Sequence, residues 1–283
     1  MQFLDTATLV ENFDEYVDSA LGWITDHGNA FFSFVRDCLE AIYGGVLWLV
    51  QLPPALVLIV LFGLIGWRLV HLGFGLISAL ALLLCLAMGL WTETLSTLSL
   101  VVIATFMAIA FGLPIGILSG LVKPVGHIVD PVLDLVQTLP PYIYLLPCIA
   151  LLGYGPATAL VATIIIAIPP VIRLASLGIR QTPNEFLELG DATGLTKWQM
   201  FTKIRLAFAR PSILAGINQS LMMAFGMVVI AGIVGSGGLG QTIYSAIRTL
   251  NIALSINAAI AIVILTMIID GLTQSSANKT DRT

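Results

Sequence analysis

Long apolar runs are the feature that most constrains how this sequence can fold. A helix that crosses the hydrocarbon core of a bilayer needs roughly 20 apolar residues, within a range of about 17–25. Several runs in this chain reach or approach that length, and they are apolar throughout rather than alternating, which excludes membrane strands. The runs predict transmembrane helices near 53–68, 73–90, 95–120, 139–155, 157–178, 212–234 and 252–270.

Composition agrees with a chain that faces lipid. Of its 283 residues, 58% are hydrophobic and only 10% are charged, whereas soluble domains average about 45–50% and about 25%. One soluble core cannot hide that much apolar surface. The net charge of −4 excludes nucleic-acid binding, which requires a basic surface. We therefore predict an all-α, polytopic membrane bundle of about seven transmembrane helices.

Residues 1–50 differ from the rest because charged residues interrupt their apolar pattern. Val10, Phe13 and Val17 recur at helical spacing, with acidic residues between them. This pattern predicts amphipathic helices that lie at the membrane surface. An alternative is that 31–50 forms an additional span, although it contains three charged residues.

The basic residues predict an orientation, because cytoplasmic segments of membrane proteins carry an excess of Lys and Arg. With the N-terminus outside, ten of the twelve basic residues lie on the inner side, and only Arg36 and Arg248 lie outside. The expected organisation is an extracytoplasmic N-terminal segment (1–50), a transmembrane domain (51–275) with a cytoplasmic loop (179–211), and a cytoplasmic tail (276–283).

The interiors of the expected spans contain no Asp, Glu, Lys, Arg or His. Proton-driven transporters usually carry such groups as relays inside the membrane. We therefore expect energy to enter from outside the membrane domain, although sodium coupling through the backbone of broken helices stays open.

Three cysteines, Cys38, Cys85 and Cys148, lie far apart in the sequence and form no CxxC pair. We interpret them as small buried hydrophobes. Neither they nor any other cluster predicts a metal site, and we expect none.

Polar residues near the ends of two expected spans are candidates for a translocation path. Buried amides and hydroxyls are costly in lipid unless they are paired. We therefore expect these side chains either to form hydrogen bonds between helices or to line a water-filled path. The candidates are Gln137, Thr138, Asn218, Gln219 and Ser220.

Glycines mark two further features. Gly112, Gly116 and Gly120 lie four residues apart, which predicts close helix packing within the subunit. Gly235–Gly240 matches GxGxxG but follows an apolar helix rather than a strand, so it does not predict dinucleotide binding. We expect a flexible turn there, on the outer side.

The loop 179–211 carries the end signals of two helices. Thr182–Glu185 has the sequence of a capping box with proline at the first helical position, and Gly194 predicts a left-handed stop. Thr196–Gln199 is a second capping box. Its helix is expected to end near Pro211, because the residue before a proline resists helical geometry.

This loop resembles the EAA loop of bacterial ABC importer permeases, whose pattern is E-A-A-x3-G-x9-I-x-L-P. The Glu, Gly, Ile and Leu of the pattern occur here at the family's spacing, while its small pair is Leu-Gly and its final Pro is Ala. The resemblance implies that the loop docks on a cytoplasmic ATPase. Residues implied to form or brace this coupling element are Glu188, Asp191, Gly194, Ile204 and Leu206.

The resemblance extends over about 95–275 and narrows to the glycine betaine/proline-betaine permease subfamily. Further motifs occur in the family's order and at its spacing. They are Asp134–Pro140, Tyr144–Pro147, Ile168–Leu174, Gly216–Met222, Met227–Ile230 and Gly237–Gln241.

Membership would imply the type I ABC importer permease fold and a multi-pass subunit of the bacterial plasma membrane. The implied cargo is a quaternary-amine or zwitterionic osmolyte: glycine betaine, proline betaine, choline or trimethylamine N-oxide. The implied partners are a second permease copy, two cytoplasmic ABC ATPase chains, a separate extracytoplasmic solute-binding protein and membrane lipid. Because about 13 residues follow the last expected span, we expect no fused binding domain.

We expect no catalytic residue and no cofactor in this chain. The sequence contains no GxxxxGK[ST] motif, so ATP and Mg are expected on the partner ATPase. The alternative from another class is an ion-coupled secondary transporter or channel for a small solute.

Overall fold

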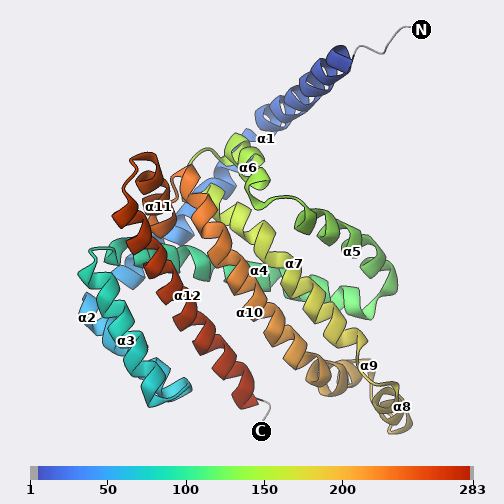
Figure 1. Ribbon diagram of the computed structural model, residues 1–283. Coiled ribbons are helices and arrows are strands. Elements are labelled where there is room, and N and C mark those ends of the chain that lie inside the picture. Colours follow the sequence, from blue (N-terminus) through green and yellow to red (C-terminus); the bar gives the residue numbers. More distant parts are fainter. Residues whose placement is uncertain (1–5, 281–283) are drawn as a thin grey trace.

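The computed structural model describes residues 6–280, and every regular element in that part of the chain is helical, as the apolar runs predict. Figure 1 shows most of the helices gathered into one bundle, from which the start of α1 projects. In chain order they are α1 (Thr6–Gln51), α2 (Ala55–Leu69), α3 (Leu72–Ala87), α4 (Trp91–Leu121), α5 (Lys123–Thr138), η1 (Pro141–Tyr144), α6 (Leu145–Leu152), α7 (Pro156–Arg180), α8 (Asn184–Ala192), α9 (Lys197–Gln199), η2 (Met200–Arg205), α10 (Leu206–Ala231), η3 (Gly232–Val234), α11 (Gly238–Arg248) and α12 (Ile252–Thr280).

Four helical segments are long and apolar enough to cross a membrane: α4, α7, the continuous stretch Lys197–Val234, and Ile252–Ser275 of α12. Two pairs of helices joined at a sharp bend also reach this length and apolarity when each pair is taken as one span. The second part of α1 meets α2 at 91°, and α5 meets η1–α6 at 104°. Together with α3, a shorter apolar helix of 16 residues, these segments account for the expected polytopic bundle of about seven helices.

Residues 139–155 do not form the single span that their hydropathy predicts. Leu139 is extended, as the residue before a proline tends to be, so α5 ends at Thr138. The apolar stretch then forms a short turn and the eight-residue helix α6. Eight residues rise about 12 Å, far less than the roughly 30 Å of a hydrocarbon core. The apolar composition of 139–155 therefore did not reveal that the helix is broken in this segment.

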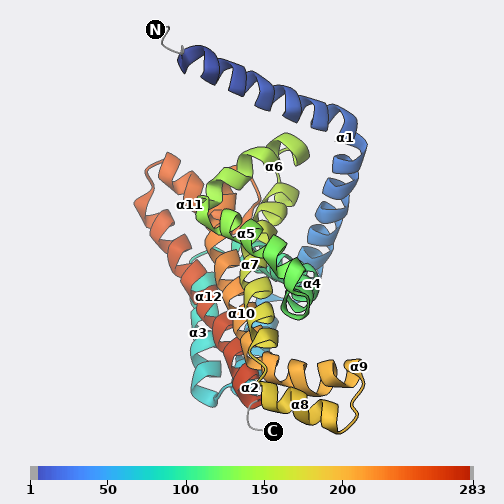
Figure 2. The ribbon, with the colours of Figure 1, turned by 90° about the vertical axis from the view of Figure 1, so that its right-hand side faces the viewer.

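The core of the bundle is centred on α7, which lies between α4 and α10 (Figures 1 and 2). The glycine stripe of α4 faces α7, as predicted. A Cβ added at Gly116 would lie 2.7 Å from the Ile172 carbonyl oxygen and 2.8 Å from the Ala175 Cβ. On the other side of α7, a Cβ at Gly178 would lie 2.9 Å from the Ala209 Cα. The two helix contacts are thus backbone to backbone.

Residues 6–51 form one continuous helix, α1. Its second half is part of the bundle, because Leu39 and Tyr43 are buried in the main hydrophobic cluster together with residues of α4 and α7. The interfacial, extracytoplasmic placement of the N-terminal segment stays a prediction.

The glycine-rich turn after α10 is present and is closely packed rather than loose. Gly235, Gly237 and Gly238 have φ values of +75°, +78° and +73°, which favour glycine. The amide N–H of Leu239 donates to Thr97 Oγ1 of α4 at 2.8 Å. The turn leads into α11, a helix that the sequence analysis did not anticipate.

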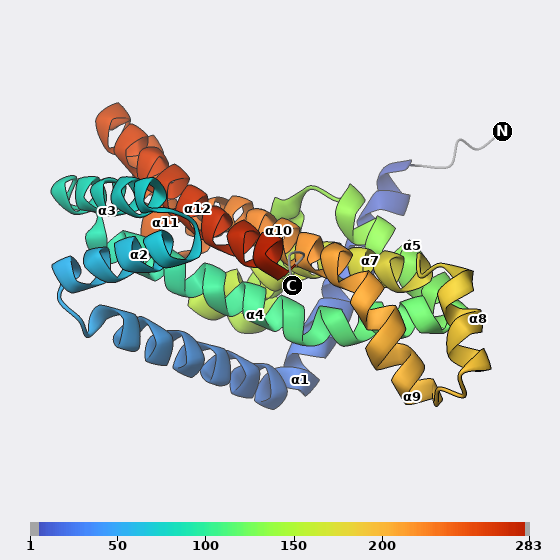
Figure 3. The ribbon, with the colours of Figure 1, turned by 90° about the horizontal axis from the view of Figure 1, so that it is seen from below.

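The two ends of the bundle differ. Figure 2 shows α8, α9 and the end of α12 at one end, and the start of α1 with α6 and α11 at the other. Seen from below in Figure 3, α8 and α9 extend from the bundle on the side away from α2 and α3. A segment that projects in this way is available for a partner to bind.

Candidate functional site

The projecting segment, residues 182–205, has the helix–corner–helix form predicted for the EAA-like loop, and we call it the elbow. Gly194 has a φ of +74° and forms the corner. The amide of Gly194 donates to the Asp191 carbonyl at 3.1 Å, and the amide of Leu195 donates to the Gly190 carbonyl at 2.9 Å. These bonds end α8 at a left-handed glycine, as predicted.

Only one of the two predicted capping boxes forms. The Gln199 amide N–H donates to Thr196 Oγ1 at 3.3 Å, and the Thr196 N–H donates to Gln199 Oε1 at 3.0 Å. The box at Thr182 was predicted wrongly, because Pro183 occupies the N-cap position. The Thr182 hydroxyl is buried and donates instead to the Ile179 carbonyl at 3.0 Å, at the end of the preceding helix.

The second arm of the elbow does not stop near Pro211, so that prediction was also wrong. Helix α9, the π-helical turn η2, α10 and the 3₁₀ turn η3 form one helical stretch, Lys197–Val234, of 38 residues. Pro211 lies inside α10. The local bias before the proline is overridden by packing, since Ala209 is fully buried against Gly178 of α7. The second arm and a candidate span are therefore one element.

The five residues of the predicted coupling element fall into two groups. Glu188, Asp191 and Gly194 are exposed on α8 and its corner. Ile204 and Leu206 are half-buried and face inward. The first group is placed where a partner can reach it, and the second braces the elbow.

The bracing contacts explain why the second position of the family's small pair is a small residue, Gly190, here. A Cβ at Gly190 would lie 2.5 Å from Met200 Cε and 3.0 Å from Ile204 Cδ1. A small residue at this position lets α8 pack on η2. Leu206 packs against the buried cluster of Ala175, Ile179, Ala209 and Ile213, which ties the elbow to α7.

Large apolar side chains are exposed on the elbow. Leu189 is 57% exposed and Trp198 is 71% exposed. The ring of Phe186 contacts that of Phe208 of α10 in a tilted arrangement, with 4.7 Å between the ring centroids. Sequence reasoning concentrated on the motif positions and missed these side chains, although bulky apolar residues in an otherwise polar loop are a signal for a contact surface.

Two of the path candidates form side-chain hydrogen bonds to neighbouring helices. The Ser220 hydroxyl is fully buried and donates to the Ala167 carbonyl of α7 at 2.7 Å. Asn218 Oδ1 accepts from the Thr273 hydroxyl of α12 at 2.9 Å. In this chain both side chains connect α10 to its neighbours.

The other three path candidates are exposed. Gln219 and Gln137 form no side-chain hydrogen bond in the described part of the chain, and the Thr138 hydroxyl donates only to the Leu135 carbonyl at 3.0 Å. No hydrogen bond among the described residues joins this end of α5 to the polar cluster of α10. The five residues are therefore not one site within a single chain.

Two ion pairs connect α5 and α7, and sequence reasoning missed both. Arg173 pairs with Asp134, and Arg180 pairs with Asp130 at 3.5 Å. The two aspartates lie four residues apart and the two arginines seven apart, so each pair of like charges shares one helix face. That spacing was the available signal. All four side chains are partly exposed, so each pair contributes about 0–1 kcal/mol.

Cys85 and Cys148 are buried, as expected, but Cys38 is exposed, so its interpretation as a core residue was wrong. Among the described residues, no group of three or more His, Cys, Asp or Glu side chains is placed to hold a metal ion.

Comparison with known proteins gives a family match and relatives that align along most of this chain. Residues 112–282 match the family described as binding-protein-dependent transport system inner membrane component. The chain is 38% identical to the glycine betaine transport system permease protein OpuAB of Bacillus subtilis (strain 168), over 97% of this chain and 96% of the relative. It is also 38% identical to the glycine betaine/proline betaine transport system permease protein ProW of Escherichia coli (strain K12), over 93% and 74%.

A more distant relative and a solved structure complete the comparison. The trimethylamine N-oxide transport system permease protein TmoV of Pelagibacter ubique (strain HTCC1062) is 35% identical over 76% of this chain and 30% of the relative. A chain of the inward-facing MetNI methionine ABC transporter superposes with a TM-score of 0.59 at 23% identity, covering 68% of this chain and 94% of that one. At that identity the likeness concerns the fold, which is that of an ABC importer permease.

Proposed function

The chain belongs to the family of binding-protein-dependent transport system inner membrane components, as a permease subunit of an ABC importer, and from this membership we propose that its cargo is a quaternary-amine or zwitterionic osmolyte. The observation that carries the proposal is the 38% identity to a glycine betaine permease along 97% of the chain. Candidate solutes are glycine betaine, proline betaine, choline and trimethylamine N-oxide. Family membership removes the ion-coupled secondary transporter or channel as an alternative.

The permease acts with partners. It pairs with a second copy of itself and with two ABC ATPase chains that bind ATP and Mg, while a separate solute-binding protein delivers the cargo. The bundle lies in the bacterial plasma membrane with the elbow inside and the start of α1 outside. The basic residues support this orientation, since the elbow carries Lys197, Lys203 and Arg205.

The elbow transmits the movement of the ATPase. Exposed Glu188, Asp191 and Leu189 offer α8 as the docking surface, and Gly194 sets the angle between the arms. Because the second arm continues into α10 without a break, a displacement of the elbow moves that span directly. Backbone contact between Gly178 and Ala209 then carries the movement into α7.

Transport follows from alternating access. Closure of the ATPase pair on ATP brings the two elbows together and favours the outward-facing state. Gln137, Thr138 and Gln219 line the path, where their exposed polar groups face water in the paired assembly. Asn218 and Ser220 lie beside the path and hold α10 to α12 and α7.

Reconstitution tests the proposal. The permease is placed in proteoliposomes with an ABC ATPase and a solute-binding protein from the same genome, and uptake of radiolabelled glycine betaine is measured with ATP or a non-hydrolysable analogue inside. The expected result is ATP-dependent uptake that unlabelled proline betaine, choline or trimethylamine N-oxide reduces by competition. Uptake that needs only an ion gradient, or that ignores all four solutes, contradicts the proposal.

A further inference from the structure

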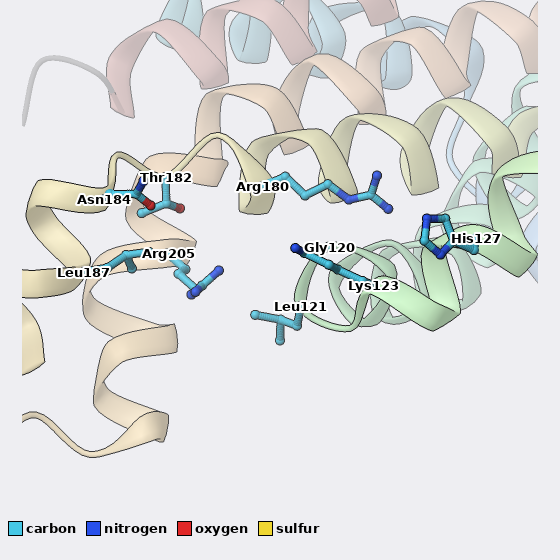
Figure 4. Close-up of a pocket in the computed structure, with 9 residues that line it drawn as sticks. All are labelled: Gly120, Leu121, Lys123, His127, Arg180, Thr182, Asn184, Leu187 and Arg205. Carbon is cyan, nitrogen blue, oxygen red and sulfur yellow. The ribbon is translucent and has the colours of Figure 1, made fainter.

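A cavity of about 480 Å³ lies between the elbow and the turn that joins α4 to α5. It is separate from the candidate solute path, since none of the path residues lines it. Figure 4 shows side chains from α5, α7 and η2 around it. The lining residues are Gly120, Leu121, Lys123, His127, Arg180, Thr182, Asn184, Leu187 and Arg205.

The lining of this cavity is basic. Lys123, Arg180 and Arg205 contribute three positive charges, His127 adds ring nitrogens, and among the described residues no acidic side chain lines the space. In Figure 4, Lys123 and Arg205 extend into the space from opposite walls. Like charges that share a cavity repel one another unless an anion lies between them.

Three of the four basic side chains have no partner. Lys123, His127 and Arg205 form no side-chain hydrogen bond or ion pair in the described part of the chain, and Arg205 is half-buried. A partly buried guanidinium without a hydrogen-bonded counter-charge is unfavourable. The cavity thus presents unused donors from both of its walls.

Arg180 is held in place by its surroundings. Its guanidinium donates to the Ser119 carbonyl at 3.1 Å and pairs with Asp130 at 3.5 Å. A Cβ at Gly126 would lie 2.2 Å from Arg180 Nη2, so the Arg180 guanidinium in this position lies directly against the Gly126 backbone. Asp130 offsets one of the three positive charges, and the lining keeps a positive excess.

The acidic group of the adjoining cavity does not reverse this balance. That space of about 300 Å³ shares Leu121 and Arg205 with the first cavity and is lined by Asp191 and Lys197. The negative charge that Asp191 adds is therefore matched by the positive charge of Lys197. The region as a whole stays positive.

We propose that the cavity binds a phosphate group, carried by an anionic phospholipid headgroup or by a soluble phosphate compound. Guanidinium and ammonium groups arranged around a shared space are the ordinary means of phosphate recognition. The rim favours a lipid, because Leu118 and Leu121 are exposed on the adjacent surface of α4, where an acyl chain can lie. Basic pockets of this kind at the inner face of a membrane bind lipid headgroups.

A phosphate in this cavity connects two parts of the machinery. Lys123 and His127 belong to α5, whereas Arg205 is the last residue of the elbow and Arg180 ends α7 just before it. The bound group therefore restrains the elbow relative to α4 and α5. This inference does not depend on the identity of the transported solute. Ligand binding is measured on the permease by itself, and co-purification with the ATPase is a separate readout.

The first experiment counts retained lipid. Full-length permease is purified from mixed micelles that contain phosphatidylglycerol or phosphatidylcholine, and bound lipid is measured by native mass spectrometry. The double variant K123Q/R205Q is compared with K203Q/R210Q, which removes two exposed basic residues near the same end without touching the cavity. We expect phosphatidylglycerol to bind the first variant at least about tenfold more weakly, and the second as in the parent chain.

The second experiment addresses a soluble source and the fold. Inorganic phosphate and pyrophosphate are titrated while the thermal unfolding midpoint is followed, and the charge-conserving variant K123R/R205K serves as the folding control. If phosphate or pyrophosphate raises the unfolding midpoint saturably, and only K123Q/R205Q loses this effect, the ligand is a soluble phosphate compound. If K123Q/R205Q instead loses only phosphatidylglycerol, the ligand is a lipid headgroup. The proposal is overturned if K123Q/R205Q retains every ligand, or if K203Q/R210Q loses ligand to the same extent as K123Q/R205Q. So does a defect of K123Q/R205Q confined to assembly with the ATPase, since a protein carboxylate would then fill the cavity.

Discussion

Single glycines decide how closely the helices of this permease approach. Gly116 touches the backbone of α7, and backbone cannot move aside in the way that the end of a flexible side chain can. Gly226 also lies inside a helix, but an added Cβ there meets nothing within 4 Å. The two positions therefore distinguish packing from intrinsic helix propensity.

Gly116→Ala is expected to lower the free energy of unfolding by about 1–3 kcal/mol, because the added methyl overpacks the contact with Ile172 and Ala175. Gly226→Ala is the matched control and is expected to be neutral or to stabilise by about 0.5–1 kcal/mol. Thermal or denaturant unfolding in detergent measures both. Equal stability of the two variants would show that the α4–α7 contact is looser than described.

Neighbouring polar residues on α10 have different surroundings and so different expected roles. Ser220→Ala removes a hydrogen bond to α7 and is expected to cost about 0.6 kcal/mol of stability without changing the KM for solute. Gln219→Ala is expected to raise KM and leave the unfolding midpoint unchanged, since the amide is exposed. Uptake kinetics and unfolding curves on both variants separate these effects. The reverse pattern would place Ser220, rather than Gln219, in contact with the cargo.

At the scale of elements, the elbow is the part whose form best explains its proposed role. Its first arm exposes acidic and apolar side chains, its corner is a left-handed glycine, and its second arm is continuous with a span. A stiff helix transmits displacement, whereas a flexible loop would absorb it. Changes at the exposed arm should therefore affect coupling more than folding.

Glu188→Ala is expected to reduce ATP-dependent uptake at least about tenfold, corresponding to the loss of one charge-assisted contact with the ATPase. Because Glu188 is exposed and makes no side-chain bond in the described part of the chain, the unfolding midpoint should not change. Glu185→Ala, one turn earlier on α8 and also exposed, is the control. Uptake and ATPase co-purification are measured together, and full activity of the Glu188 variant would remove this residue from the docking surface.

At the scale of the whole molecule, the main hydrophobic cluster draws on helices that lie far apart in the sequence. The second half of α1 contributes Leu39 and Tyr43 to the same cluster as residues of α4, α7 and α10. The stretch of α1 from Ser19 to Ala30 is mostly exposed. Helix α1 thus combines a mostly exposed stretch with a half that packs into the core of the bundle.

Deletion of residues 1–30 is expected to leave the bundle folded, whereas deletion of 1–51 is expected to abolish a monodisperse product, because it uncovers the cluster around Leu39 and Tyr43. Size-exclusion profiles and unfolding midpoints in detergent distinguish the two. A folded product from the longer deletion would show that α1 only lines the surface of the bundle.

Sequence alone was sufficient for features that local chemistry determines. Apolar length predicts lipid-facing helices, Gly194 predicts a left-handed corner, and the pairing of Thr196 with Gln199 predicts a capping box. Each depends on neighbours within a few residues. The family resemblance rested on the same local spacings.

Tertiary structure decided the features that depend on distant partners. Pro211 stays inside a helix because Ala209 packs on α7, and the Ser220 hydroxyl of α10 donates to the Ala167 carbonyl of α7, 53 residues away in the sequence. The basic cavity unites side chains from α5, α7 and η2. No local pattern contains these distances, because helix packing brings together residues that the chain separates by dozens of positions.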